Sequence, residues 1–241
     1  MYPTSQTWNT LIEQTGHYFE TKVRIDGTDY EKDQLISISA NYTMFADDSP
    51  TVGGCLAGEL SVSIIHPQEN IPRMAKVEPF VRVKAGNQTS EWIPQGKFFI
   101  DTRETTKNND GLPILSLHCY DAMLKAEADY PNTTHDWPMS DIDVVNEIAM
   151  TMGLQTSVEE PDGIDTRTIT AVANGYQIGL PAGQTMREVL SNIAAMYGGN
   201  WIMNYDGQLL LIKITDLPPE TNYLVTIAGD PITFGGDRIL V

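Results

Sequence analysis

The chain has 241 residues, of which 41% are apolar and 20% are charged, and its acidic surplus gives a formal net charge of −17. That length is sufficient for one large or two small hydrophobic cores. No stretch approaches the roughly 18 consecutive apolar residues of a membrane-spanning helix, and residues 1–9 lack a signal-peptide pattern. A pI near 4.4 disfavours contact with phosphate backbones and anionic lipid. We therefore expect no membrane insertion and no specific nucleic-acid binding.

Residues 1–130 are expected to form mostly β-strands. Apolar side chains recur at every second position between Gly, Pro, Asn and Asp residues, which is the pattern of half-buried strands. An Asp-Gly turn at 26–27 separates the first two runs. We expect a mainly antiparallel sheet that curls into a barrel or sandwich, with a short helix near residues 4–14 packed on it. The alternating runs are Phe19/Val23/Ile25, Ile36/Ile38/Ala40, Leu60/Val62/Ile64, Val81/Val83, Phe98/Ile100 and Leu115/Leu117.

From about residue 121 the apolar period changes from two to about 3.6, which predicts helices. Residues 121–128 are good helix formers, and Pro131 ends this first helix. A second helix begins at Ser140, which forms a variant of the capping box with Asp143, and it ends before Gly153. Its apolar face consists of Ile142, Val145, Ala149 and Met152.

A third helix has the clearest sequence signals. It opens at Thr185 with Glu188 as its capping-box partner and ends at the Gly-Gly pair 198–199. A hairpin with an Asp-Gly turn at 206–207 follows it directly. The strand at 208–214 has no polar face, so we expect cover on both of its sides. The apolar stripe of the helix consists of Val189, Leu190, Ile193, Ala194 and Tyr197.

The remaining segments are less regular. Residues 154–165 favour a polar surface loop, and 168–172 and 176–180 favour two short strands. Two more strand-like pieces lie at 223–227 and 238–241, where an apolar end is typical of a strand that continues in a longer chain or pairs with another subunit.

These patterns predict an α+β chain in three parts. Residues 1–130 form a strand-rich, barrel-like domain, and residues 131–214 form an α+β domain with two capped helices and a hairpin. Residues 215–241 begin a further strand-rich segment.

A search for local catalytic and binding motifs finds none. The motifs of phosphate-binding loops, dinucleotide sites, serine hydrolases and zinc metalloproteases are absent. The four histidines, His17, His66, His118 and His135, are scattered and show no metal-ligand spacing. We therefore assign no catalytic, cofactor-binding or metal-binding residue and expect no enzyme activity.

The acidic pairs have structural explanations. A glycosidase needs two carboxylates that flank a sugar bond. The pairs Asp141/Asp143, Glu159/Glu160 and Asp162/Asp165 lie in a helix start and a polar loop, where carboxylates interact with the helix dipole and with water. We expect these structural roles and no catalytic pair.

Aromatic residues and cysteines also fit a core. Trp92, Trp137 and Trp201 supply material for a sugar-stacking platform, but their positions at strand entrances and under the third helix favour core anchors. Cys55 and Cys119 show no ligand spacing. We favour two small buried side chains over a long-range disulfide.

Three stretches occur in a recognisable order. The first is 59–67 (ELSVSIIHP), and the second is 92–101 (WIPQGKFFID) running on to 115–126 (LSLHCYDAMLKA). The third is 185–195 (TMREVLSNIAA), followed by the sequence Gly-Asn-Trp at 199–201 and the Asp-Gly turn. Together they resemble the baseplate hub or tail-associated proteins of tailed bacteriophages and prophages, over residues 60–214.

This resemblance implies a structural protein with barrel-like domains. Members of that family assemble as trimeric rings that adapt the tail tube to a spike or fibre. The resemblance therefore implies a homotrimer, other tail or baseplate proteins as partners, DNA that passes through the ring, and a place in the virion tail after assembly in the host cytoplasm. Two alternatives stay open, a carbohydrate-binding or adhesin module and a tail-associated cell-wall hydrolase.

Overall fold

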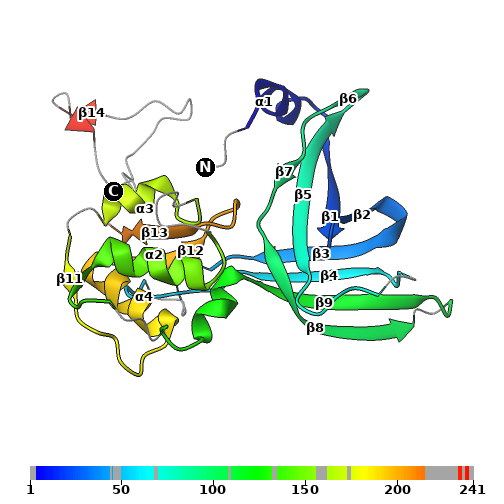
Figure 1. Cartoon of the computed structure of the whole chain (residues 1–241). Coiled ribbons are helices and arrows are strands. Elements are labelled where there is room, and N and C mark those ends of the chain that lie inside the picture. The colour runs from blue at the N-terminus through cyan, green and yellow to red at the C-terminus, as the bar shows by residue number, and fades with distance from the viewer. Residues whose placement is uncertain are drawn as a thin grey trace.

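The structure, a computed structural model, describes residues 4–43, 45, 50–67, 70–107, 110–131, 135–155, 162–172, 175–214, 233–234 and 237–238. Most of its helices gather around a small hairpin at one end, and a curled sheet with the N-terminal helix forms the other end (Figure 1). Both parts are built mostly from consecutive stretches of chain. The prediction of an α+β fold is therefore confirmed.

One antiparallel sheet contains most of the strands. Its order is β2-β1-β5-β8-β9-β4-β3, with the two short strands β6 and β7 paired to β5. The strands are β1 (Tyr18–Ile25), β2 (Thr28–Glu31), β3 (Leu35–Asn41), β4 (Glu59–Ile65), β5 (Lys76–Ala85), β6 (Gln88–Thr89), β7 (Ile93–Pro94), β8 (Phe98–Lys107) and β9 (Pro113–Asp121). The short 3-10 helix η1 (Lys32–Gln34) connects β2 to β3.

The sheet is curled but open. β5 joins β8 through only two register pairs, Lys76 with Phe99 and Val77 with Phe98. At this corner the strands around β5 run steeply across the direction of β8 and β9 (Figure 1). The path ends at β2 and β3, which do not pair with each other. The predicted barrel-like curl is present, but the sheet does not close because its two end strands are separate edges.

Alternation along the strands places one face of the sheet inside. β4 has the pattern expected from its sequence, with Leu60, Val62 and Ile64 buried between more exposed neighbours. Together with Phe98 and residues of β1, β5 and β9, they form a first core. The helix α1 (Gln6–Ile12) begins after Ser5, which caps it, and buries Leu11 against β5. The predicted N-terminal helix is thus confirmed.

The other elements form the helical part. They are η2 (Ala122–Glu127), β10 (Met139–Ser140), α2 (Asp141–Thr151), α3 (Thr166–Ala171), β11 (Gln177–Ile178), α4 (Met186–Met196), β12 (Gly199–Met203) and β13 (Leu209–Lys213). Two short strands, β14 (Thr233–Phe234) and β15 (Asp237–Arg238), pair with each other. The expected strand at 223–227 and the end of the chain at 239–241 lie outside the described residues.

The two predicted capped helices are confirmed. Ser140 caps α2, and Thr185 and Glu188 form the capping box of α4. Two other expectations are wrong in detail. Residues 122–127 form a 3-10 helix instead of an α-helix, and residues 166–171 form the helix α3 where a strand was expected.

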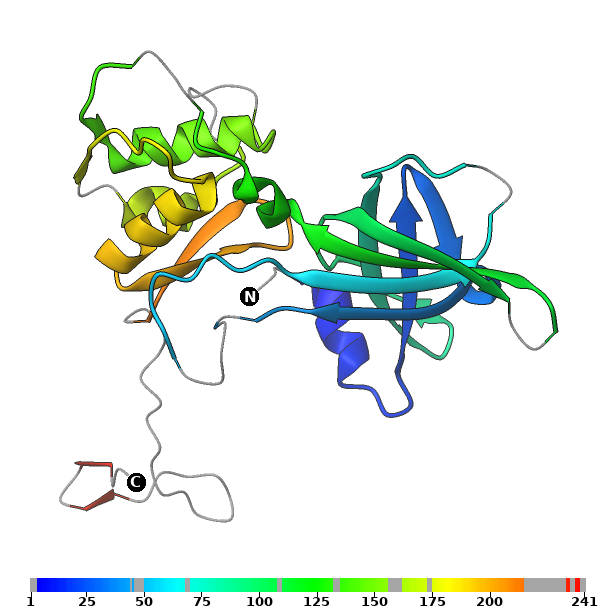
Figure 2. The ribbon, with the colours of Figure 1, turned by 90° about the horizontal axis from the view of Figure 1, so that it is seen from below.

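The hairpin β12–β13 forms the base of a second core. Trp201 is fully buried, and its indole N–H donates to the carbonyl of Leu190 in α4 at 2.7 Å. The residues of α2, α4 and η2 cover this face of the hairpin. Residues 53–56 run parallel to β12 and pair with it around Cys55 and Trp201 (Figure 2). The hairpin sheet therefore includes a segment that precedes β4 in sequence.

The two cores have separate sets of buried residues. The chain passes from one to the other at residues 57–59 and again at 121–122. The domain boundary near residue 130 stays a prediction. No helix among the described residues is both long enough and apolar enough to span a membrane.

Candidate functional site

Small hydroxyl side chains cover the outer face of four neighbouring strands, β3, β4, β9 and β8. The register aligns them in two rows across the sheet, opposite to the core face. Ser63 and Ser116 lie within hydrogen-bond distance at 3.2 Å. Neither row contains a Lys or Arg that could pair with a phosphate. The rows are Ser39–Ser61–His118–Thr102 and Ser37–Ser63–Ser116–Glu104.

This four-stranded region has two free edges among the described strands. β3 pairs only with β4, and most of its residues are exposed. β8 pairs with β5 only at its first two residues, and its exposed residues 101–107 pair only with β9. Unpaired strand edges present N–H and C=O groups that can pair with another chain. The two free edges and the rows between them are therefore the candidate site.

The buried carboxylate of Asp121 links the two segments in which the chain passes between the two cores. Asp121 ends β9, is 2% exposed, and accepts hydrogen bonds from the N–H groups of Gly58 at 2.6 Å and Met123 at 2.9 Å. Burial raises the pKa of Asp121 to about 6, although the two N–H donors act in the opposite direction. Gly58 is required here, because a Cβ atom would lie 2.9 Å from the ring of Tyr42.

The side chains of Tyr42 and Arg187 make further contacts at this connection between the sheet and the helical part. Tyr42 donates to the carbonyl of Gln95, and its ring contacts Phe98 of the sheet and Tyr205 of the hairpin turn. Arg187 of α4 donates to the carbonyls of Cys55 and Met123 and forms an ion pair with Glu127. Together with Asp121, these contacts connect the sheet to the helical part through both connecting segments.

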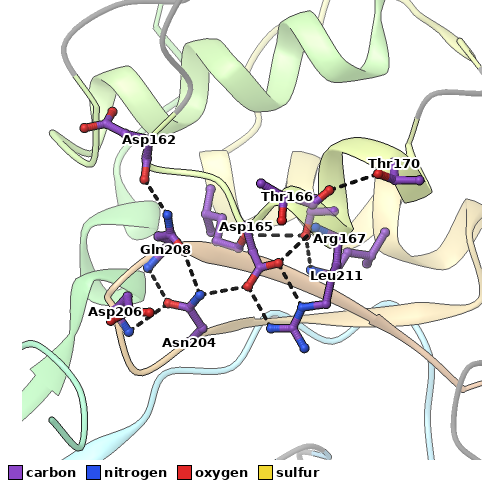
Figure 3. Close-up of polar contacts among 11 residues, drawn as sticks. Asp162, Asp165, Thr166, Arg167, Thr170, Asn204, Asp206, Gln208 and Leu211 are labelled. Atoms are coloured by element: carbon purple, nitrogen blue, oxygen red, sulfur yellow. Dashed lines mark hydrogen bonds and ion pairs between the residues drawn. The ribbon is translucent and has the colours of Figure 1, made fainter. Parts of the chain in front are cut away.

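A polar network fastens the loop before α3 to the turn of the hairpin (Figure 3). The Asp165 carboxylate accepts from the Arg167 guanidinium at 2.9 and 2.7 Å and from Asn204 at 2.9 Å. The amide oxygen of Asn204 accepts from the N–H groups of Asp206 and Gln208. The hydrogen bond from Arg167 lowers the pKa of Asp165 to about 2. The carboxylate is therefore ionised and fixed.

An open groove of about 480 Å³ lies beside this network. Its floor is the outer face of the hairpin, with Ile202, Leu210 and Ile212. Tyr42 and Tyr205 form one wall, with ring centroids 5.7 Å apart and ring planes perpendicular. We expected β13 to be covered on both of its sides. The side that faces α4 is covered, whereas the other side lines this groove.

The histidines do not form a site. His17 and His66 each contact a nearby backbone carbonyl. His118 lies on the hydroxyl face, 3.9 Å from Glu59, and His135 lies 3.2 Å from Glu147. No group of three possible metal ligands occurs within the described part of the chain.

Among the acidic pairs, Asp141 and Asp143 have different partners. Asp141 is fully buried and accepts from the N–H groups of Ile142 and Tyr176 and from the hydroxyl of Tyr197. Asp143 contacts the capping residue Ser140. The pair Glu159/Glu160 lies outside the described residues.

The tryptophans and cysteines divide as follows. Trp201 is a core anchor. Trp92 is partly buried on the outer side of the sheet, and the Cζ atom of Arg82 lies over its ring, 4.2 Å from the ring centroid. Trp137 is partly buried against the second core. Cys55 and Cys119 are both buried and unpaired with each other, and burial raises the pKa of each thiol to about 12.

The sequence analysis assigned no role to Asp121, Tyr42 or Arg187, and it gave the groove residues Asp165 and Asp206 separate structural roles. Asp121 stands directly before the 3-10 helix as its cap, which was a local signal for a structural carboxylate. The others come together only through long-range contacts, for which the sequence had no local pattern.

Two solved structures of phage tail proteins have a fold similar to this curled open sheet joined to a helix-covered hairpin. The tail protein from Neisseria meningitidis MC58 is similar with a TM-score of 0.51 and 15% identity, over 87% of this chain and 56% of that chain. The 43 kDa tail protein of prophage MuSo2 from Shewanella oneidensis is similar with a TM-score of 0.52 and 13% identity, over 91% of this chain and 62% of that chain.

These comparisons confirm the predicted resemblance at the level of the fold. The chain spans less than two thirds of the length of both tail proteins. Neither a protein-family model nor a curated protein matches the sequence.

Proposed function

We propose that the chain is a structural subunit of a phage tail or tail-like particle, and that it forms a ring at the hub or tip that joins the tail tube to a spike or fibre. The fold shared with two phage tail proteins supports a role in the tail. In this proposal the chain acts without catalysis, and its partners are copies of itself and adjoining tail proteins.

One observation carries the ring proposal. The strands β8, β9, β4 and β3 form an antiparallel block with a free edge at each end. Because the number of strands is even, β3 of one copy runs antiparallel to β8 of the next copy when two blocks are placed side by side. Such a head-to-tail contact can repeat around an axis and close into a ring.

The faces of the block support the same arrangement. One face belongs to the first core, so the other face, with its Ser and Thr rows, is the one that remains for a channel. A wall without Lys or Arg does not hold phosphate groups by ion pairing. A DNA molecule therefore passes such a wall without sticking.

The oligomeric state tests this proposal. Light scattering on the purified chain should give a mass near three chains of 26.7 kDa, about 80 kDa, for a closed trimer. A mass that stays at that of one chain up to high protein concentration would contradict the proposal.

Proline variants of β3 locate the contact. Successive N–H groups of a strand point to opposite sides, so one of Ser39→Pro and Ala40→Pro removes a donor from the β3–β4 ladder and the other removes one from the free edge. The edge variant should keep the thermal stability of the monomer but lose the oligomer. An edge variant that folds and still gives the trimer mass would show that β3 is not the contact.

A further inference from the structure

The groove beside the hairpin has the composition of a small-molecule site. Its volume of about 480 Å³ lies within the range of ligand pockets, and it combines an apolar floor with a few polar groups. Tyr42 and Tyr205 expose 37% and 40% of their surface, so both side chains are only partly buried. The same groove contains Arg167 and Asp206 at its polar side.

The Arg167 guanidinium at the polar side is held in place before any ligand binds. The fork of Arg167 is fixed by two hydrogen bonds to Asp165, and Asp165 is itself fixed by Asn204. The Nη1 atom of Arg167 and the carboxylate of Asp206 make no hydrogen bond to another described residue. Arg167 and Asp206 line the groove together with Tyr42 and Tyr205, and both belong to the network drawn in Figure 3. Preorganisation of this kind reduces the entropy lost on binding.

We propose that this groove binds a neutral sugar ring of a saccharide. The apolar C–H face of a pyranose packs on an aromatic ring, and neighbouring hydroxyl groups pair with planar groups such as guanidinium and carboxylate. The groove offers both kinds of contact side by side. This inference does not require the ring assembly, because all residues of the groove belong to a single chain and lie where the hairpin meets the residue after β3.

The negative charge of the chain and of the groove favours a neutral saccharide over an acidic one. The chain carries a formal net charge of −17, and Asp165 and Asp206 outnumber Arg167 at the polar side. An acidic saccharide would therefore be repelled. A protein segment is the other occupant that an apolar floor could accept, and the experiment below separates the two.

Ligand-observed NMR on the full chain tests the proposal with chitotriose and maltotriose as neutral probes and trigalacturonic acid as the acidic probe. We expect saturation transfer to at least one neutral probe, with a dissociation constant of about 1 mM for a single bound ring. Trigalacturonic acid should show no transfer. Tyr205→Leu, which keeps apolar bulk but removes the ring, should weaken binding by about tenfold.

Tyr18→Leu is the matched control, because Tyr18 is also exposed but lies on β1. It should leave saccharide binding unchanged, and thermal melting should show that both variants are folded. The absence of transfer from both neutral probes to the wild-type chain would overturn the proposal. Equal binding by folded Tyr205→Leu would also overturn it, and a change in the mass of Tyr205→Leu without any saccharide signal would assign the groove to a protein contact.

Discussion

Replacement of Asp121 by Asn tests how the two cores are joined. Asp121 is almost completely buried, and burial raises its pKa to about 6 from the ordinary value of 3.8. The folded chain therefore holds this proton more tightly than the unfolded chain. The carboxyl group contributes stability that is fully present below pH 3.8 and is lost as the pH rises through about 6.

The two pKa values set the size of this effect. Each pKa unit corresponds to about 1.4 kcal/mol, so the free energy of unfolding should fall by about 3 kcal/mol across the whole window. The free energy of unfolding should decrease by about 1.4 kcal/mol between about pH 5 and about pH 7.5. Both pH values lie above the isoelectric point. Urea unfolding at these two pH values should show that loss in the wild-type chain and not in Asp121→Asn. An equal loss in both chains would refute the role of Asp121.

Asp165→Asn is a control with the opposite sign. The ion pair with Arg167 lowers the pKa of Asp165 to about 2, so its contribution to stability is present above pH 3.8 and is lost as the pH falls through about 2. Asp165→Asn should therefore lower the free energy of unfolding by about 2 kcal/mol at both pH values. It should not change the difference between them.

Three other substitutions test the second core and the hydroxyl face. Ile193→Asp should destabilise the helical part by about 4 kcal/mol or more, because it places an unpaired charge in the core. Asn192→Asp, on the exposed side of α4, is the control and should have little effect in the same urea titration. Trp201→Phe should cost about 2 kcal/mol, because it removes the hydrogen bond to Leu190 and some buried volume, and an unchanged melting temperature would contradict this contact. His118→Ala should leave the mass by light scattering unchanged, and loss of the oligomer would reveal a role for His118 in assembly.

Much of the fold follows from local patterns in the sequence. The alternating runs of β4 and β9 and the capping box of α4 appear where they were expected. The helix α3 was missed because Thr168, Ile169 and Thr170 are β-branched and favour strands. Tertiary contacts override that preference: Asp165 caps the helix, and the hydroxyl of Thr168 accepts from the N–H of Leu211 at 2.8 Å.

The candidate surfaces were harder to predict. The sequence predicted a strand at 238–241 that continues in a longer chain or pairs with another subunit, but it did not predict free edges in the sheet. Which edges are free depends on the order of strands in the sheet, and the corner at β5 and β8 has no local signal. The groove likewise depends on Tyr42 and Tyr205, whose separation in sequence hides their contact.

The parallel pairing of residues 53–56 with β12 has a consequence for how the protein is made. Gly54 and Asn200 are 146 residues apart in the chain. At a synthesis rate of roughly 5 to 20 residues per second, the first segment leaves the ribosome about 10 to 30 s before its partner exists. The curled sheet on either side of it can fold during that interval. In a chain that folds during synthesis, this pairing therefore forms only after the hairpin has been made, and a pause in translation ahead of β12 would delay it.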